Sequence, residues 1–491
     1  MTGTTAFLTD RYELTMVDAA LRAGTAHRRS VFEVFARSLP NGRRYGVVAG
    51  TGRMLDAIRD FRFGDEELGW LERENVVTPA TLAWLADYRF TGTVHGYREG
   101  EPFFPNSPIL VLEGGFAETV LLETVILSIL NHDSAVAAAA ARMVSVADGR
   151  PLSEMGSRRT GEVSAVAASR AAYIAGFSAT SNLEAGRAWG VPTMGTAAHA
   201  FTLLHDSEEQ AFRAQVEALG PGTTLLVDTY DVRQGVETAV RVAGTGLGAV
   251  RLDSGDLPAL VAEVRAQLDG LGATGTRITV TNDLDEATIG ALRAAPVDSY
   301  GVGTSLVTGS GAPTAGMVYK LVAHVDDDGA WVPVAKRSAS KASVGGRKRA
   351  WRQTDARGTA IAEIVRTRGL PPERARELLV PLVVDGAVDE RWTGPAGVTA
   401  ARAHHAYAMG ELPARRCASA AATRPASPPS STDAPRSPLL AAKLLPASAL
   451  CSQPPAPSPQ LPGPQLPGPP APLCQMTELS GARSAATSLR A

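Results

Sequence analysis

The middle of the chain repeats one hydrophobic pattern. Short runs of apolar and β-branched residues are followed by small or polar residues, and then by a stretch with helical periodicity, at intervals of roughly 15–30 residues. The apolar runs predict strands at 175–177, 191–194, 224–227, 249–252, 278–281 and 299–302. The periodic stretches between them predict helices at 208–219, 232–242, 257–268 and 284–294.

Polar residues follow each predicted strand. They are Ser178 and Thr180, Thr196 and His199, Asp228 and Thr229, Asp253, Ser254 and Asp256, Asn282 and Asp283, and Gly303 and Thr304. Strand–helix alternation is typical of a parallel sheet, and an α/β barrel builds its active site at the carboxyl ends of the strands. An open doubly wound sheet would do the same, but no GxGxxG follows a predicted strand. We therefore expect an α/β fold with an irregular α/β barrel.

The flanking segments suggest three further parts. Residues 1–115 mix predicted strands at 30–35 and 91–97 with helices, and we expect an N-terminal α/β domain there. The barrel domain would span 116–350 and begin with a mostly apolar helix or helix pair at 118–143. Residues 351–416 would form a C-terminal extension that packs on the N-terminal domain.

The composition changes at residue 417. Sixteen of the 33 prolines and all three cysteines (Cys417, Cys451 and Cys474) lie in 417–491, and no aromatic residue follows Tyr407. Proline lacks an N–H donor and fixes φ, so we expect a disordered Pro/Ala/Ser-rich tail, with a proline-rich ligand for a partner domain as the alternative. The absence of cysteine from the first 416 residues excludes a disulfide framework, a thiolate zinc site and a cysteine nucleophile there.

Charge and hydropathy point to a cytoplasmic protein. The formal net charge is −2, which gives no reason to expect a nucleic-acid or membrane partner. The longest apolar stretches, such as 119–130, are short and interrupted by Glu123, and the first ten residues lack the pattern of a signal peptide.

Two strand ends carry the residues best suited to catalysis and ligand binding. His199 follows Gly195 and two alanines; a neutral imidazole can accept a phosphoryl group or act as a base, although a lone histidine is more often structural. Arg251 offers a planar fork to a carboxylate or phosphate. Asp253 and Asp256 suit ribose hydroxyls or a magnesium shell, with a surface ion-pair cluster as the alternative.

Two further segments suit phosphate groups. Backbone amides in 300–305, Tyr-Gly-Val-Gly-Thr-Ser, are unobstructed after a strand and can form an anion nest. The basic stretch 336–348 either neutralises a pyrophosphate or is a solvated loop. The residues alone thus indicate an α/β enzyme for a phosphorylated, ribose-bearing substrate with an anionic co-substrate.

Eight ordered elements between Leu8 and Pro413 together resemble the nicotinate phosphoribosyltransferase family of type II phosphoribosyltransferases. They are residues 8–16 (Leu-Thr-Asp-Arg-Tyr-Glu-Leu-Thr-Met), 43–50 (Arg-Arg-Tyr-Gly-Val-Val-Ala-Gly), 121–124 with Asn131, 156–159 (Gly-Ser-Arg-Arg), 195–199 (Gly-Thr-Ala-Ala-His), 250–256 (Val-Arg-Leu-Asp-Ser-Gly-Asp), 301–304 (Gly-Val-Gly-Thr) and 336–348. The resemblance implies a reaction in NAD salvage. Nicotinate and phosphoribosyl pyrophosphate give nicotinate mononucleotide and pyrophosphate, with coupled hydrolysis of ATP.

The resemblance also implies roles for single residues. His199 would be phosphorylated by the co-substrate ATP, and Asp253 and Asp256 would be catalytic and hold Mg²⁺. Nicotinate would be bound by Tyr12, Thr196 and Arg251, and phosphoribosyl pyrophosphate by Arg159, Gly303, Thr304 and Thr308. A homodimer with shared active sites is implied as well, with Tyr12 acting on the neighbouring subunit.

One departure and two rival functions accompany this resemblance. The family generally ends soon after residues 411–413, so the tail suggests a reading-frame change near Arg416, which resequencing the locus would test. A nicotinamide or quinolinate phosphoribosyltransferase is one rival, and an inactive phosphoribosyl pyrophosphate-binding barrel is the other.

Overall fold

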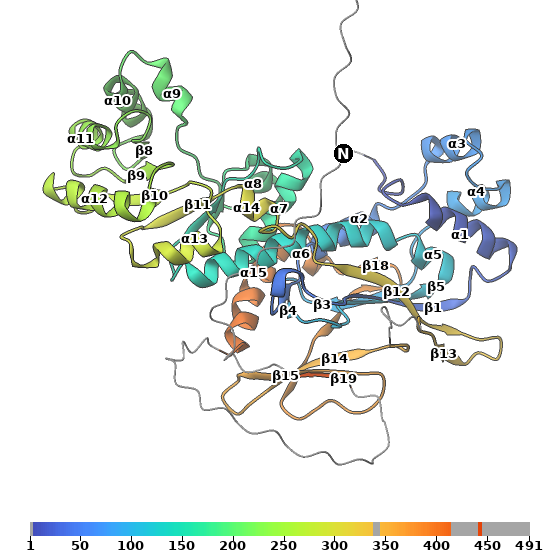
Figure 1. The fold of residues 1–491 in the computed structure, drawn as a ribbon. Helices are drawn as coiled ribbons and strands as arrows, with labels where there is room; N and C mark the ends of the chain where they lie inside the picture. The colour runs from blue at the N-terminus through green and yellow to red at the C-terminus, as the bar shows by residue number, and fades with distance from the viewer. Residues whose placement is uncertain (1–2, 337–343, 414–439, 444–491) are drawn as a thin grey trace, which may run out of the picture. The chain divides into compact units, whose positions relative to one another are not determined.

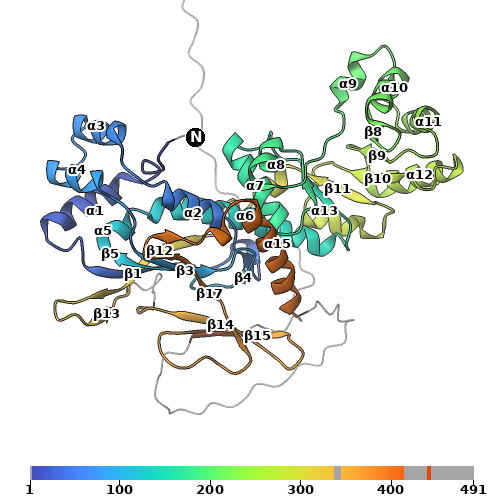
Figure 2. The same cartoon turned by 180° about the vertical axis from the view of Figure 1, so that it is seen from behind.

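An antiparallel sheet of seven strands organises the N-terminal part. The computed structural model describes residues 3–336, 344–413 and 440–443. The strand order is β13-β12-β1-β5-β3-β17-β18; Figure 1 shows this sheet and Figure 2 shows it from behind. Its strands are β1 (Arg29–Ala36), β3 (Thr93–Tyr97), β5 (Leu110–Gly115), β12 (Met317–Val325), β13 (Trp331–Pro333), β17 (Leu379–Val384) and β18 (Ala387–Val388).

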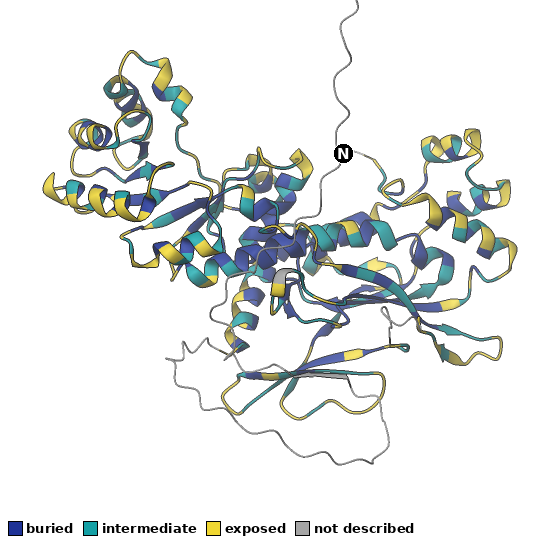
Figure 3. Cartoon of the chain, viewed as in Figure 1, coloured by how far each residue is buried: buried dark blue, intermediate teal, exposed yellow. Residues whose placement is uncertain are grey.

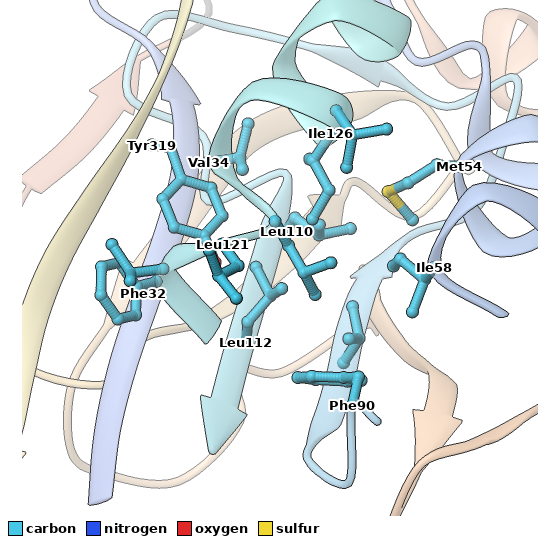
Figure 4. Packing of buried hydrophobic residues seen from close by; sticks show 14 of the residues in the cluster. Phe32, Val34, Met54, Ile58, Phe90, Leu110, Leu112, Leu121, Ile126 and Tyr319 are labelled. Carbon is cyan, nitrogen blue, oxygen red and sulfur yellow. The ribbon is translucent and has the colours of Figure 1, made fainter. Parts of the chain in front are cut away.

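Helices from the first third of the chain cover this sheet. They are α1 (Arg11–Arg22), α2 (Thr51–Arg59), α3 (Asp65–Arg73), α4 (Pro79–Ala86), α5 (Phe116–Val120) and α6 (Glu123–Val146); η1 (Pro40–Gly42) and the pair β2 (Gly46–Val47) and β4 (Pro102–Phe103) lie between them in sequence. Figure 4 shows part of the core, one hydrophobic cluster that includes Phe32 and Val34 of β1, Leu110 of β5, Tyr319 of β12 and Met54 of α2. Burial of such side chains contributes about 1.5–3 kcal/mol each.

The second sheet is parallel and has six strands in the order β7-β6-β11-β10-β9-β8. Its strands are β6 (Leu152–Glu154), β7 (Ala179–Thr180), β8 (Thr224–Leu226), β9 (Ala249–Leu252), β10 (Arg277–Val280) and β11 (Ser299–Val302). The helices that follow them are α7 (Glu162–Ile174), α8 (Leu183–Trp189), α9 (His199–Leu204), α10 (Glu208–Leu219), α11 (Val232–Ala243), α12 (Leu257–Gly270), α13 (Glu286–Ala291) with η2 (Leu292–Ala294), and α14 (Thr304–Val307). Among the described strands none joins β7 to β8, so the expected barrel is partial rather than closed.

A third sheet and one helix complete the described residues. The sheet order is β16-β14-β15-β19, with β14 (Arg349–Thr354), β15 (Ala360–Arg366), β16 (Ala375–Glu377) and β19 (Leu440–Lys443). After η3 (Glu390–Trp392), α15 (Gly394–Glu411) packs against α7, α8 and α2. The predicted tail, 417–491, otherwise lies outside the described residues; within it, β19 pairs with β15 where we predicted no strand.

The structure confirms most of the predicted parallel sheet and corrects two strands. Strands β8 to β11 lie at the predicted positions. The strand predicted at 175–177 is wrong: these residues turn away from α7 through Gly176, whose φ is +113°, and the strand begins at Ala179. The strand predicted at 191–194 reduces to a single bridge between Thr193 and Thr180, because Pro192 has no N–H to donate.

The predicted domain boundaries do not follow the sheets. Residues 317–333, which we had assigned to the barrel domain, pair with β1 of the N-terminal sheet as β12 and β13. Of the C-terminal extension, β17 joins the N-terminal sheet beside β3, whereas α15 also packs on helices of the barrel. The sheet thus combines β1, β3 and β5, which precede residue 116, with β12, β13, β17 and β18, which follow it, and sequence order does not reveal this pairing.

The apolar helical stretch at 116–146 is a core element. Among the described residues it is the one stretch that could cross a membrane by length and composition, and 61% of its most apolar window is buried in the protein. Figure 3 shows α6 mostly in the colour of buried residues, whereas outer helices such as α3 and α12 carry exposed faces. Its alanine run, 137–141, is buried and lets α7 pack closely.

Candidate active site

A cavity of about 480 Å³ lies at the carboxyl ends of the parallel strands. The residues that line it come from the segments after β6, β7, β9, β10 and β11 and from the stretch that leads to α9. They are Met155, Ser157, Arg158, Arg159, Ser181, Met194, Gly195, Thr196, Ala197, Ala198, Arg251, Asp253, Thr281, Asn282, Asp283, Gly301, Gly303 and Thr304. Parallel strands bring their carboxyl ends to one edge of the sheet, so residues distant in sequence converge here.

Arg251 is the best-anchored cation of the cavity. Its side chain is only 14% exposed. Its Nε donates to Thr281 Oγ1 at 2.8 Å, Nη1 donates to Thr196 Oγ1 at 3.2 Å and to the carbonyl of Ala197 at 3.4 Å, and Nη2 donates to Asp253 Oδ1 at 3.2 Å. These bonds fix the plane of the guanidinium, which is the requirement for two-pronged recognition of a carboxylate or phosphate.

Asp253 is held as a carboxylate. Burial opposes its ionisation, but the hydrogen bond from Thr281 and the charge of Arg251 outweigh burial, so the pKa of Asp253 lies below its ordinary value. Its backbone N–H donates to Asp228 Oδ2 at 2.8 Å, and the hydroxyl of Ser254 donates to the same oxygen at 2.8 Å. Asp228 therefore fixes the backbone from which Asp253 projects.

His199 is the first residue of α9, directly after the cavity-lining residues 194–198; Figure 2 shows this helix next to α10. Its Nδ1 is 3.1 Å from Thr229 Oγ1, and its Nε2 is 3.9 Å from Asp253 Oδ2. The side chain is 40% exposed. Because Thr229 occupies Nδ1, Nε2 is the ring nitrogen that can meet an incoming electrophile.

A second group of acids lies next to these residues. Burial and the carboxylates of Asp228 and Asp231 raise the pKa of Glu208, the first residue of α10, to about 7. Within the described part of the chain, Glu208 Oε1 and Asp228 Oδ1 are buried without a hydrogen-bond partner. Buried acceptor oxygens of this kind suit a bound cation or a donor from a substrate.

The predicted site residues fall into two groups. Arg159, Thr196, Arg251, Asp253, Gly303 and Thr304 line the cavity, and His199 adjoins it through Asp253. Asp256 is exposed at the N-cap of α12, and Thr308 ends α14 with its hydroxyl donating to the carbonyl of Thr304 at 2.8 Å; neither lines the cavity.

Tyr12 lies outside the cavity of its own chain. It is 46% exposed on α1, and its partial burial together with the charge of Glu123 raises its pKa to about 12. Phe7 and Trp70, which contact each other with ring centroids 5.4 Å apart, are exposed as well.

The basic stretch 336–348 is described only at its ends, and residues 337–343 lie outside the described residues. Lys348 is buried: its Nζ donates to Glu33 Oε2 at 2.5 Å and to the carbonyl of Val344 at 2.8 Å. Arg347 pairs with Glu113 at 3.3 Å. These two cations are therefore part of the N-terminal sheet's ion pairs.

Comparison with known proteins identifies the family. A sequence profile of the nicotinate phosphoribosyltransferase N-terminal domain matches residues 7–131. A nicotinate phosphoribosyltransferase of Mycobacterium tuberculosis is 62% identical over 390 residues, which cover 77% of this chain and 86% of that protein. The chain belongs to the nicotinate phosphoribosyltransferase family. The enzyme of the same name from Bacillus subtilis is 38% identical over 355 residues, which cover 70% of this chain and 72% of that protein.

Solved structures agree with this family. Human nicotinic acid phosphoribosyltransferase superposes with a TM-score of 0.71 at 25% identity, covering 82% of this chain and 94% of that chain. The nicotinate-nucleotide pyrophosphorylase of Pyrococcus furiosus has the same fold, with a TM-score of 0.69 at 24% identity over 83% of this chain and 95% of that chain.

The geometry brings to the candidate site residues to which sequence reasoning gave no role. Asp228, Asn282 and Asp283 follow predicted strands, so their positions were a usable signal. Thr281 lay inside a predicted strand, and nothing in its sequence context indicated that its hydroxyl bridges Arg251 and Asp253.

Proposed function

We propose that this chain is an ATP-coupled nicotinate phosphoribosyltransferase of NAD salvage. It would join nicotinate to phosphoribosyl pyrophosphate, giving nicotinate mononucleotide and pyrophosphate. The observation that carries the proposal is Arg251, a mostly buried guanidinium held by four hydrogen bonds at the cavity of a chain that belongs to this family. A cation held in this way suits the carboxylate of nicotinate, which nicotinamide lacks.

The cavity offers a place for each part of the reactants. Arg251 and Thr196 bind nicotinate, Arg159 binds the pyrophosphate, and Gly303 and Thr304 at the start of α14 bind the 5-phosphate. With both substrates so placed, the pyridine nitrogen attacks the ribose carbon and the bond to pyrophosphate breaks. Positioning and charge stabilisation account for most of the rate in such a displacement.

The ATP step is assigned to His199. Nε2 attacks the γ-phosphorus of ATP, the bond to ADP breaks, and the phosphohistidine is later hydrolysed to free phosphate. Thr229 holds Nδ1, and Asp253 lies 3.9 Å from Nε2, where its charge favours the cationic ring that forms.

Magnesium is the cation we propose for the phosphate groups. Mg²⁺ usually takes one or two carboxylates with phosphate oxygens and water. Asp253 lines the cavity and Asp256 does not, so Asp253 is the first carboxylate to assign, with the buried oxygen of Asp228 nearby. When bound, the ion would neutralise charge on the phosphates.

A homodimer with shared sites accounts for Tyr12. Its ring is exposed on α1 and does not line its own cavity, so we assign it to the cavity of a second subunit. Mixed Tyr12→Ala and Arg251→Ala chains should then regain activity in their heterodimers, up to about one quarter of the wild-type sites. If Tyr12 acts within its own chain, the mixture stays inactive.

The substrate is tested by turnover. The purified chain is given phosphoribosyl pyrophosphate, ATP and either nicotinate, nicotinamide or quinolinate, and the mononucleotide is measured. We expect product from nicotinate far in excess of the other two. Preference for nicotinamide or quinolinate, or binding of phosphoribosyl pyrophosphate without any product, would replace the proposal by one of its rivals.

A further inference from the structure

Glu154 is a buried carboxyl group that the proposed reaction does not use. It is the last residue of β6, and its side chain is fully buried below the cavity residue Met155. In the described part of the chain, its two oxygens accept hydrogen bonds from one backbone N–H and two hydroxyls. A carboxylate buried among neutral donors requires a reason, because burial without a paired cation costs free energy.

The first oxygen holds the arginine-bearing loop, 156–159. Glu154 Oε1 accepts from the N–H of Gly156, and the N–H of Arg159 closes the loop on the carbonyl of Gly156 at 2.8 Å. Gly156 is tightly enclosed: a Cβ there would lie 2.3 Å from Val307 Cγ1 and 3.1 Å from the carbonyl oxygen of Gly303. The loop is therefore held directly against the strand end that carries Gly303 and against α14.

The second oxygen holds the end of β7. Glu154 Oε2 accepts from Ser169 Oγ of α7 at 2.8 Å and from Thr180 Oγ1. Thr180 Oγ1 in turn accepts from the N–H of Asn182 at 3.0 Å, and the side-chain amide of Asn182 donates to Ser157 Oγ at 3.0 Å. Through Thr180 and Asn182, Glu154 is thus linked a second time to the loop 156–159.

We propose that Glu154 is a positioning residue for phosphoribosyl pyrophosphate. It fixes the spacing between the loop that carries Arg159 and the Gly303–Thr304 segment. These are the two places to which we assign the pyrophosphate and the 5-phosphate, so the inference rests on the proposed function. One substrate bridges both places, and its affinity depends on their separation.

The test compares Glu154→Gln with wild type by steady-state kinetics. The amide nitrogen of glutamine cannot accept a hydrogen bond. Either the Gly156 N–H therefore loses its acceptor, or the hydroxyls of Ser169 and Thr180 must accept from the amide instead of donating. We expect KM for phosphoribosyl pyrophosphate to rise on the order of 10- to 100-fold, while KM for nicotinate stays within about threefold, because Arg251 is held by other residues.

Glu363→Gln is the matched control. Glu363 of β15 is also buried and accepts from two hydroxyls, those of Tyr97 and Ser107, with Arg352 as a further partner. It should lower the melting temperature without moving either KM. Thr180→Val removes one hydroxyl of the Glu154 network, and its effect on KM should not add to that of Glu154→Gln, since both act on one network.

Each outcome has a distinct meaning. An active, folded Glu154→Gln protein with unchanged KM for phosphoribosyl pyrophosphate overturns the positioning role and leaves the proposed function standing. A parallel rise in both KM values also overturns it. If Glu154→Gln does not fold, Thr180→Val carries the same comparison. If wild type forms no mononucleotide, the proposed function fails, and calorimetric binding of phosphoribosyl pyrophosphate to wild type and variant decides the positioning role separately.

Discussion

Replacing Arg251 by alanine should weaken the use of nicotinate far more than the use of phosphoribosyl pyrophosphate. In the free protein, four hydrogen bonds to Thr281, Thr196, Ala197 and Asp253 hold the guanidinium. Arginine has five N–H donors, so nicotinate can take the remaining one and must displace a weak contact, such as the 3.4 Å bond to the Ala197 carbonyl, to receive two.

The magnitude follows from burial of this pair. Truncating one partner of a buried, hydrogen-bonded charge pair typically costs about 2–5 kcal/mol. At roughly 1.4 kcal/mol per decade, that is on the order of 30- to several-thousand-fold in the Michaelis constant for nicotinate. Arg251→Lys should recover little, because an ammonium group cannot reproduce the planar fork that Thr281 and Asp253 align.

The assay measures both Michaelis constants for wild type, Arg251→Ala and Arg251→Lys. Arg265→Ala is the matched control, because Arg265 of α12 is also mostly buried but donates to the carbonyls of Thr276 and Ala273, away from the cavity. It should leave both constants unchanged. A rise confined to phosphoribosyl pyrophosphate in Arg251→Ala would refute the assignment of Arg251 to nicotinate.

Three further outcomes are expected. His199→Ala should abolish ATP hydrolysis and the acid-labile, base-stable labelling of the protein by γ-labelled ATP. Slow, ATP-independent product formation should persist, because Arg251 and Asp253 still position the substrates. Labelling that survives the substitution would show that another residue accepts the phosphoryl group. A chain cut after Arg416 should keep its activity and melt within about 3 °C of wild type. A second chain, cut after Leu445, retains β19 and isolates the effect of that strand. A melting temperature lower by more than about ten degrees in the chain cut after Arg416 would contradict the prediction. Burial raises the pKa of Glu13 from 4.5 to about 8, so its contribution to stability is complete below about pH 4.5 and is lost as the pH rises towards 8. Above about pH 8, the free energy of unfolding of Glu13→Gln should therefore exceed that of wild type by roughly 2–4 kcal/mol, and this difference should vanish near pH 5. An equal pH dependence of stability in both proteins would count against the raised pKa.

Local sequence patterns were sufficient for the elements that the cavity needs most. Strands β9 and β11 and helix α10 lie where apolar runs and helical periodicity placed them, because the two strands are short, mostly buried runs followed by small or polar residues and α10 buries one face. The convergence of Thr196, Arg251, Asp253 and Gly303 on one cavity followed from the rule that parallel strands end at one edge.

Tertiary pairing explains what the sequence did not reveal. Strand β6 is only three residues long and was missed, although it lies between β7 and β11 and carries Glu154. Strand β12 pairs with β1, a strand of the first 115 residues, which no local pattern indicates. The burial of Lys348 against Glu33 depends on two residues 315 positions apart, so a basic stretch read as solvated or phosphate-binding contains a core ion pair.

The most direct test of the whole account is the formation of nicotinate mononucleotide by the purified chain with and without ATP. ATP hydrolysed and product formed are counted in the same reaction. We predict that ATP raises the yield of mononucleotide from nicotinate and phosphoribosyl pyrophosphate, that its hydrolysis accompanies turnover, and that both effects vanish in His199→Ala. Wild-type product formation that is indifferent to ATP, or no product under either condition, would contradict the account.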